Sequence, residues 1–494
     1  MELSELLPLY AAHPQVAALA KIVSDGVPAV TYVEGLRASS ASLALAALSL
    51  RRLPPRTFLV VLNDEEEAGY FYHDMVQALG TDDVLFFPSS YRRAVKYGQR
   101  DAANEILRTE VLNRLARSGS GGAVADDASR PLFVVTAPAA LSELVTSSAD
   151  MQSGTVVIEE GGSYDLPELS ARLLDLGFRR RDYVYEPGEF AVRGSILDVY
   201  SFSSEYPYRI DFFGDDVDSI RTFEVQTQLS RERCRQASIV PEMASGTSGL
   251  VCFTECLPPG ACLVVRDLPY VCEAVEKIYA DGFARQAAIE QAATSELEEA
   301  ETRTRLARES LLVRGDVLRR GLLALQRVET GARPSAAAGA TLRFAVSLQP
   351  PFHKNFDLVR DAFSSYKASG HKIYVLADSD KQNERLRDIL AELRAGGAEA
   401  VDETAAALFT PVRRTLHEGF VDETLRVCFF TDHQIFDRFH KYSLRSDHAR
   451  DAKMALTLKE LMQFEPGDFV VHVDHGVGRF AGLVRVAGAD GVMQ

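Results

Sequence analysis

The sequence lacks several features that would assign the chain to a special class of protein. No run of about 18 or more apolar residues occurs, so no transmembrane helix is expected. The first residues, MELSELLPLY, have no basic stretch followed by an apolar core, which excludes a secretory signal. Together these absences predict a cytoplasmic protein with no membrane partner.

Cysteine is scarce and is not spaced as in common metal sites. The six cysteines include no C-x-x-C pair, so they are expected to be reduced thiols in a cytosolic protein. A zinc site in the Cys252–Cys272 cluster is the alternative. The six are Cys234, Cys252, Cys256, Cys262, Cys272 and Cys428.

Positive charge is also in short supply. Lysine and arginine number 54 against 70 aspartates and glutamates, which gives a net charge of −16. Phosphate binding needs basic surface, so wholesale coating of nucleic acid is excluded, although a local basic face is compatible with this total. The 494 residues, 46% of them apolar, predict a soluble globular protein of about three or four domains.

The first part of the chain alternates between apolar strands and helices. The runs at 29–33, 58–62, 84–87 and 132–136 are apolar without alternation, and helices are expected at 39–50, 65–79 and 99–117. Strands of this kind are typical of a parallel sheet covered on both faces. The segment 118–130 is rich in glycine and serine and is expected to be a surface loop.

From about residue 154 strands follow one another, including predicted strands at 183–185, 190–193, 208–213 and 217–225. Gly214–Asp216 is typical of a tight hairpin. We predict an α+β domain inserted into the α/β domain, because α/β character resumes at 261–266. A helix-forming, charged stretch covers 283–330, and 331–339 is expected to be a linker or loop. A small α/β layer and the beginning of a β-rich module follow, and the lack of a terminating element suggested a fragment of a longer protein.

The predicted domains are therefore these: an α/β domain at 25–150, completed by 1–24 and 231–350; an inserted α+β domain at 151–230; a small α/β domain at 351–445; a linker helix at 446–463; and an incomplete β-rich module at 464–494.

A phosphate-binding loop is expected after the first strand, but its chemistry is missing. Aligned on G-x-x-x-x-G-K-[ST], Gly35 keeps the first glycine, Ser40 replaces the second, Ala41 replaces the lysine and Ser42 keeps a hydroxyl. Without the ammonium, triphosphate binding loses its main electrostatic contribution. The alternative is an ordinary strand–helix turn, and both interpretations predict that no ATP is hydrolysed here.

Other candidate constellations are weaker. The acidic run 63–67 resembles a metal-binding motif but is explained more simply as a helix start. Four aspartates around the hairpin could suggest a metal site but are explained more simply as solvated turn residues. The residues at 472–475 could likewise be metal ligands but are explained more simply as a turn. The aspartates are Asp211, Asp215, Asp216 and Asp218, and the turn candidates are His472, Asp474 and His475.

The densest surface signal interleaves arginines with aromatics, in GFRRRDY at 177–183 and EFAVRG at 189–194. A planar guanidinium pairs with carboxylates and stacks on rings, so such patterns are typical of protein interfaces. The alternatives are phosphate contacts or an ordinary exposed strand.

These residues also carry a family resemblance. The run 161–223 resembles the UvrA-binding domain shared by UvrB and the transcription-repair coupling factors of the Mfd family. The earlier segments VEGLRASSASLALAAL, FLVVLNDEEEA and VLFFPSSYRRAVKYGQRD resemble the first α/β domain of that family, and 464–483 resembles the start of its RNA polymerase-interacting domain. The degraded loop and a link too short for UvrB's DNA-clamping hairpin favour the Mfd family over UvrB.

The resemblance implies a fold, partners and sites. The fold would be a multidomain α/β protein: a degenerate P-loop, helicase-like domain with an inserted UvrA-binding domain, a small α/β domain and a CarD-like module. UvrA would be bound through Arg193, with Arg179, Arg181, Glu189 and Phe190 nearby. The polymerase β subunit would be bound through Arg479, Leu483 and Val486. The ATP- and Mg-dependent motor on double-stranded DNA would lie beyond Gln494, so no cofactor and no catalytic residue are expected in this chain.

Two alternatives compete with this binding module. The first is a UvrB-like, ATP-dependent enzyme that verifies DNA damage. The second is a nucleic-acid-binding protein that uses the arginine-rich stretch Arg303–Arg327.

Overall fold

The computed structural model describes residues 1–51, 53–80, 83–90, 102–119, 130–204, 206–225, 227–241, 249–281, 311–395, 408–440, 467, 469–472 and 476–479. The predictions for most of 118–130, for 283–310, for the linker helix and for Leu483 and Val486 lie outside the described residues. No single helix among those described is long and apolar enough to cross a membrane.

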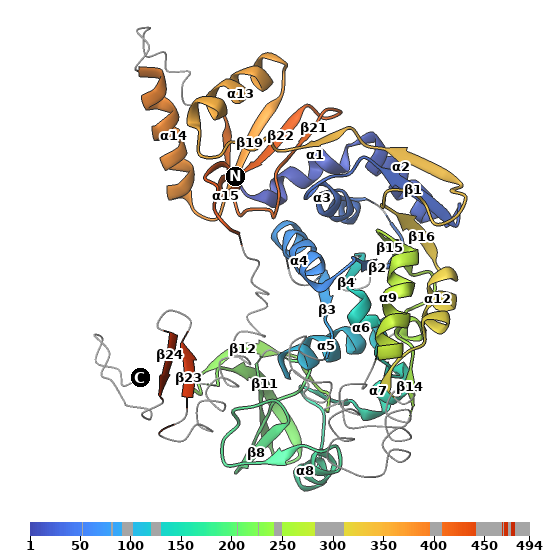
Figure 1. Ribbon diagram of the computed structural model, residues 1–494. Coiled ribbons are helices and arrows are strands. Elements are labelled where there is room, and N and C mark those ends of the chain that lie inside the picture. Colours follow the sequence, from blue (N-terminus) through green and yellow to red (C-terminus); the bar gives the residue numbers. More distant parts are fainter. Residues whose placement is uncertain are drawn as a thin grey trace.

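A seven-stranded parallel sheet forms the first domain (Figure 1). Its order is β17-β1-β16-β15-β2-β4-β3, and every neighbouring pair is parallel. The inner strands β2, β4 and β15 are buried along their whole length, as a sheet covered on both faces requires. The predicted parallel sheet in a mixed α/β fold is confirmed. The strands are β1 Val30–Glu34, β2 Thr57–Val61, β3 Val84–Phe87, β4 Leu132–Thr136, β15 Cys262–Val265, β16 Gln326–Glu329 and β17 Ala340–Arg343.

Helices cover both faces of this sheet, and a separate apolar core lies on each side. On one side lie η1 Leu3–Leu6, α1 Leu7–Ala11, α2 Pro14–Asp25, α3 Ser40–Ala46, η2 Ala47–Leu50 and α4 Glu65–Leu79. On the other lie α6 Pro138–Leu141, α9 Leu268–Asp281, α12 Gly315–Leu323 and the second half of α5 Ala102–Gly119. Short elements complete this layer: β5 Val145–Thr146, α7 Ser148–Gly154, β14 Leu250–Val251 and η5 Phe253–Cys256.

One expectation for the second half of this domain is wrong. The stretch up to residue 330 is not all helical, because residues 326–329 form β16 in the interior of the sheet. The segment 331–339, predicted as a linker or loop, is a loop that joins β16 to β17, an edge strand of the same sheet.

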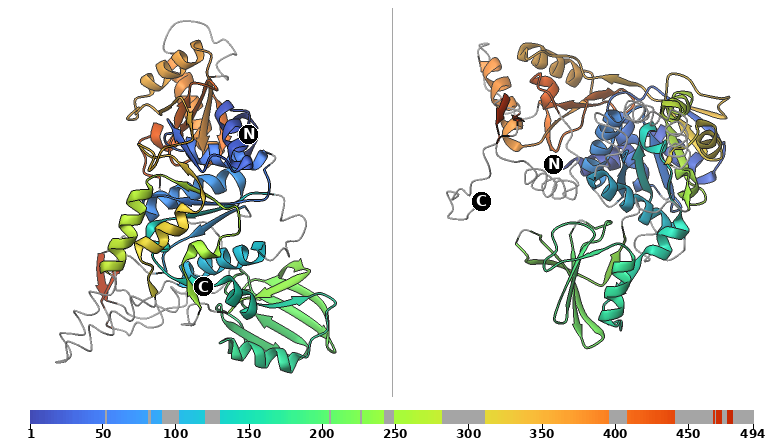
Figure 2. Two further views of the ribbon diagram at one scale, coloured as in Figure 1. Left: turned by 90° about the vertical axis from the view of Figure 1, so that its right-hand side faces the viewer. Right: turned by 60° about the horizontal axis from the view of Figure 1, so that its bottom comes forward.

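An antiparallel sheet is inserted between β4 and β15 and lies at one end of the molecule (Figure 2). Its order is β12-β11-β10-β9-β8-β7, and α8 packs on one face. The elements are α8 Leu166–Asp175, β7 Arg179–Arg180, β8 Glu189–Arg193, β9 Ile196–Val199, β10 Tyr208–Phe213, β11 Asp216–Phe223 and β12 Ser230–Cys234; a ribbon of β6 Val156–Glu159 and β13 Gln236–Ile239 leads in and out. The predicted hairpin is confirmed, with Gly214 at a φ of +67°.

The segment 183–185 is not the strand that its aromatic and β-branched residues suggested. The Glu189 carboxylate accepts hydrogen bonds of 3.1 Å from the backbone N–H groups of Tyr185 and Glu186. These bonds hold the chain in a turn, and the strand forms earlier, at Arg179–Arg180.

A third unit has a mixed five-stranded sheet in the order β18-β21-β22-β19-β20. Because β18 begins at Val346, the chain enters this sheet slightly before the predicted boundary at 350. The elements are β18 Val346–Leu348, α13 Phe356–Ala368, β19 Lys372–Ala377, α14 Asp380–Ala395, β20 Thr410–Arg413, β21 Phe420–Asp422, β22 Val427–Thr431 and α15 Asp432–Ile435. Finally, β23 Phe469–His472 and β24 Gly476–Arg479 form a hairpin.

Candidate functional site

The turn after β1 needs a glycine for steric reasons. Gly35 has a φ of +85°, and a Cβ added there would lie 2.0 Å from the backbone oxygen of Phe344. A side chain would therefore be strained twice, by its backbone conformation and by this contact. The glycine at this position allows the end of β1 to pack closely against Phe344, the residue directly after β17.

The hydroxyl groups of the segment interpreted as a degenerate phosphate loop are used within the protein. Ser40 Oγ accepts a hydrogen bond from the Arg37 backbone N–H (2.9 Å) and lies 2.6 Å from the Arg37 carbonyl. Ser42 Oγ lies 2.8 Å from the Ser39 carbonyl and 3.2 Å from Oδ2 of Asp74. Ala41 adds only a methyl group. The loop thus presents neither an ammonium nor a free hydroxyl to a nucleotide.

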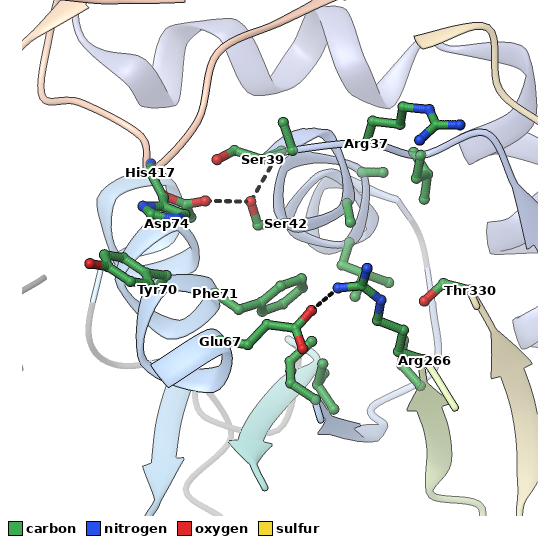
Figure 3. Close-up of a pocket in the computed structure, with 18 of the residues that line it drawn as sticks. Arg37, Ser39, Ser42, Glu67, Tyr70, Phe71, Asp74, Arg266, Thr330 and His417 are labelled. Atoms are coloured by element: carbon green, nitrogen blue, oxygen red, sulfur yellow. Dashed lines mark hydrogen bonds and ion pairs between the residues drawn. The ribbon is translucent and has the colours of Figure 1, made fainter. Parts of the chain in front are cut away.

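A cavity of about 570 Å³ lies beside this loop at the carboxyl ends of the parallel strands (Figure 3). Such edges are where α/β sheets bind ligands. Arg37 and Arg266 both line it, and Arg266 forms an ion pair with Glu67. The carboxylates that line it are Asp64, Glu66, Glu67, Asp74 and Glu418. This excess of acids over arginines opposes the binding of a polyphosphate.

Burial perturbs two groups at this cavity. Burial raises the pKa of Asp74 to about 7, against hydrogen bonds that lower it. Burial also lowers the pKa of His417 to about 4, and the neighbouring His440 and His73 lower it further. At neutral pH the His417 ring is therefore neutral, and the Asp74 carboxyl is about half protonated.

The acidic run after β2 is a helix start. The Asp64 carboxylate accepts hydrogen bonds of 2.9 Å from the backbone N–H groups of Glu66 and Glu67, and α4 begins at Glu65. This confirms the simpler interpretation of the run. Among the described residues, no group of three or more His, Cys, Asp or Glu side chains is arranged to hold a metal ion. The six cysteines are free thiols.

A second candidate site lies on the inserted sheet, on the face opposite α8. Asp198, fully buried, accepts two hydrogen bonds from Arg209, at 2.7 and 2.9 Å, and pairs with Arg193. The guanidinium of Arg193 lies 4.8 Å from the ring centre of Tyr183, and its side chain is 33% exposed. One carboxylate therefore fixes two arginines and leaves Arg193 available to a partner.

The other predicted UvrA-binding residues fall into two groups. Arg179 and Arg181 are half exposed and pair with Glu186 and Glu189 at 3.8 and 3.2 Å. Glu189 is almost buried and shapes the turn before β8. Phe190 is fully buried in the core beneath the sheet, so its side chain is not available to a partner.

Sequence reasoning missed the most exposed aromatic of this face. Phe213 is 84% exposed, whereas its neighbour Phe212 is in the core. The Phe212 N–H bonds to the Ser195 carbonyl at 2.9 Å, so Phe213 lies at the same end of the sheet as the turn that follows Arg193. Arg209 was missed as well. The sequence could have indicated Arg209, because side chains alternate between the two faces of a strand and YRIDFF places Arg209 on the face opposite the core residue Ile210.

The last hairpin is only partly described. The Arg479 guanidinium lies 4.7 Å from the ring centre of Phe469, a side chain that is 70% exposed. His472 is in β23, whereas Asp474 and His475 lie outside the described residues.

The basic stretch Arg303–Arg327 does not present a row of free cations in its described part, 311–327. Arg314 and Arg320 both pair with Asp316, at 3.1 and 3.7 Å. Arg327 is buried beside Glu329. These pairs reduce the local positive field that phosphate binding would need.

Comparison with known families agrees with this arrangement. The family model described as the UvrB interaction domain matches residues 156–244, which contain the Arg193 surface. The family model described as the CarD-like/TRCF RID domain matches residues 464–493.

Several curated transcription-repair-coupling factors are similar along most of the chain. The chain is 22% identical to the Bacillus subtilis protein over 91% of its length and 22% identical to the Haemophilus influenzae protein over 90%. It is 24% identical to the Escherichia coli protein over 70%. The chain spans only 42%, 41% and 34% of these relatives. The resemblance to transcription-repair coupling factors predicted from the sequence is confirmed.

Proposed function

We propose that this chain is the part of a cytoplasmic transcription-repair coupling factor that recruits UvrA to RNA polymerase stalled at a DNA lesion. The observation that carries the proposal is the presence, in one chain, of a UvrB interaction domain and a CarD-like/TRCF RID domain. The alternative of a UvrB-like damage-verifying enzyme is not favoured, because the relatives are coupling factors and the phosphate loop lacks its lysine.

In this proposal the inserted domain binds UvrA through one exposed face. Arg193 supplies a guanidinium held in place by Asp198, and Tyr183 and Phe213 supply exposed aromatic surface nearby. Arginine and aromatic side chains are the residues that most often dominate binding energy at interfaces. Arg179 and Arg181 extend the basic edge of this surface. The hairpin β23–β24, with Arg479, belongs to the module that would contact the polymerase β subunit.

We further propose that the described chain binds no ATP and no Mg at the degenerate loop, and that translocation on double-stranded DNA belongs to a motor outside these residues. The supporting observations are the methyl group of Ala41, the internal use of Ser40 and Ser42, and the acidic cavity.

Binding of purified UvrA to the immobilised chain tests the function. Arg193→Ala and Phe213→Ser should each weaken binding about thirtyfold, or about 2 kcal/mol, as expected for interface anchors. Phe439→Ser is the matched control, because Phe439 is 85% exposed but lies in the third unit. No binding of UvrA by the unmodified chain would refute the function, and binding unaffected by both substitutions would refute only the assigned surface.

A further inference from the structure

One loop of the third unit, residues 415–419 between β20 and β21, lies directly on the degenerate phosphate loop. The Glu418 backbone N–H donates to Ser39 Oγ at 2.9 Å, and the Ser39 N–H reaches the Glu418 carbonyl at 3.4 Å. The His417 N–H donates to Oδ1 of Asp74 at 2.7 Å. The third unit thus bonds to both helices, α3 and α4, that border the cavity.

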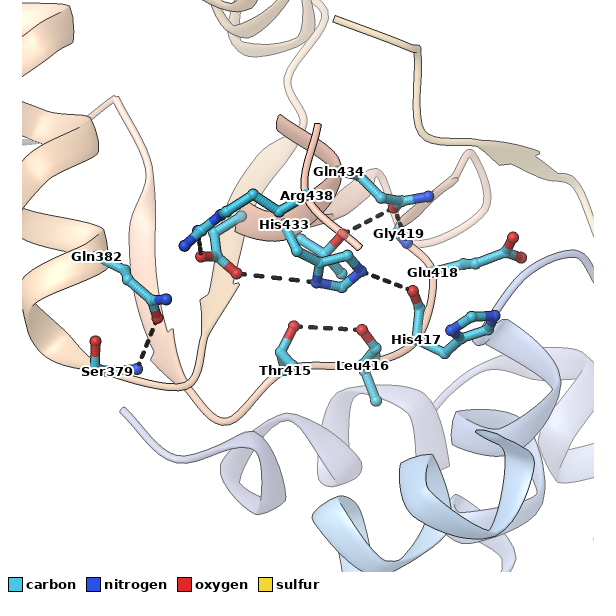
Figure 4. Close-up of polar contacts among 12 residues, drawn as sticks. Ser379, Gln382, Thr415, Leu416, His417, Glu418, Gly419, His433, Gln434 and Arg438 are labelled. Carbon is cyan, nitrogen blue, oxygen red and sulfur yellow. Dashed lines mark hydrogen bonds and ion pairs between the residues drawn. The ribbon is translucent and has the colours of Figure 1, made fainter. Parts of the chain in front are cut away.

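This loop is held in shape from behind by its own unit (Figure 4). The His433 ring nitrogen Nε2 lies 2.9 Å from the His417 carbonyl, and Gln434 Oε1 accepts the Gly419 N–H at 2.7 Å. A Cβ on Gly419 would lie 2.0 Å from Gln349 Oε1 and 2.7 Å from the Phe429 carbonyl. The loop is therefore held by its own unit on one side and hydrogen-bonded to the first domain on the other.

The side chains at the contact pack on one another or are hydrogen-bonded across it. The His417 ring stacks on Tyr70 with ring centres 3.5 Å apart, and the Tyr70 hydroxyl donates to the His440 carbonyl at 3.0 Å. Asp74 and Ser39 are buried. Buried polar groups need partners, and here the backbone of the third unit supplies them.

We propose that the loop His417–Gly419 is a built-in ligand of the degenerate phosphate loop and that the third unit thereby replaces a nucleotide in holding α3 to α4. In an intact loop, bound phosphates engage the polar groups at the start of the helix, and a lysine balances their charge. Here backbone N–H and C=O groups of the segment do so, so no phosphate charge has to be balanced by a lysine. The alanine at position 41 follows from this replacement.

Hydrogen–deuterium exchange on the whole chain tests the proposal. In the Ser39→Ala/Asp74→Ala variant, peptides covering 36–45 and 415–420 should exchange at least tenfold faster than in the unmodified chain, because both anchors of the loop are lost. Ser39→Ala alone should produce the same pattern with a smaller change, which keeps the test valid if the double variant does not fold.

Asp64→Ala is the matched control. It removes the N-cap of the same helix α4 without touching the third unit. It should speed exchange at the start of α4 and leave 415–420 unchanged. If 415–420 keeps its protection in the Ser39 and Asp74 variants, or loses it equally in Asp64→Ala, the loop is not the ligand of this site and the proposal is overturned.

Discussion

Tyr10 donates a hydrogen bond of 2.9 Å from its hydroxyl to Oδ2 of Asp422, a residue 412 positions further along the chain. Both side chains are buried, and the Tyr10 ring also packs edge-on against Phe420 and Phe429, with ring centres 6.2 and 6.0 Å apart. The first helices and the third unit thus share one core. The N-terminal segment acts as a strap that ties the third unit to the parallel sheet.

The strap predicts a measurable cost for Tyr10→Phe. The substitution keeps the ring and its packing but removes a donor from a buried carboxylate, which should cost about 1–3 kcal/mol in the free energy of unfolding. Tyr185→Phe is the control, because that side chain is 54% exposed and should change stability by less than about 0.5 kcal/mol. Urea unfolding followed by circular dichroism measures both, and equal stabilities of the two variants would contradict the role of the strap.

Gly35 predicts a second stability effect. Gly35→Ala places a Cβ against the Phe344 carbonyl at a positive φ, so it should destabilise the first domain by more than about 2 kcal/mol. Gly26→Ala is the matched control, because Gly26 also has a positive φ, +69°, but no atom within 4 Å of the added Cβ. That control should cost only about 1 kcal/mol. A difference below about 0.5 kcal/mol in thermal or urea unfolding would show that the contact relaxes freely.

The sequence predicted the parallel strands because their apolar runs are uninterrupted, but it failed at β16. That strand carries Arg327 and Glu329 into the interior of the sheet. Their polar groups are satisfied by partners in the segments that flank the strand: Arg327 Nη1 donates to the Leu323 carbonyl at 2.9 Å, and Ser335 donates its hydroxyl to Glu329 at 2.7 Å. Charged residues do not form the uninterrupted apolar run that marks a buried strand, so this strand resembles a continuation of the charged helix.

The candidate sites show the same limit. Arginines interleaved with aromatics predicted an interface at 177–183 and 189–194, and the family resemblance then implied Arg193. The absence of a lysine at position 41 is visible in the sequence itself. The contact of Ser39 with Glu418 could not be predicted from the sequence, because it joins residues 379 positions apart and uses a backbone group of Glu418 that any residue would supply. Phe190 was misplaced because composition does not tell which face of a strand is outward.

Asp198 predicts that the inserted domain depends on one buried carboxylate. Asp198→Ala leaves two neighbouring arginines without their shared anion, so it should cost about 3–5 kcal/mol. Asp218→Ala, at an exposed position of β11, is the control and should be nearly neutral. Limited proteolysis should then cleave within 156–239 in the Asp198 variant and spare the parallel-sheet domain. Retained protection of that segment would mean that the arginines need no shared partner.

Asp74 predicts a pH dependence of known sign. Burial raises its pKa to about 7 in the folded chain, above the ordinary value of 3.8 that applies when the chain is unfolded. The folded state therefore holds a proton that the unfolded state releases, so this contribution to stability is complete below pH 3.8 and is lost as the pH rises to 7. The buried histidines oppose it, because a lowered pKa removes stability as the pH falls below about 6.5.

Comparison with Asp74→Asn isolates the effect of the carboxyl from that of the histidines. The asparagine can still accept from the His417 N–H and donate to Ser42, and it does not titrate. Relative to that of the unmodified chain, the free energy of unfolding of the variant should rise by up to about 1.4 kcal/mol per pH unit between pH 4 and 7. Above pH 8 this difference should not increase further. Urea unfolding at one-unit steps measures this difference, and parallel stability curves for the two proteins would show that Asp74 is ionised in the folded chain.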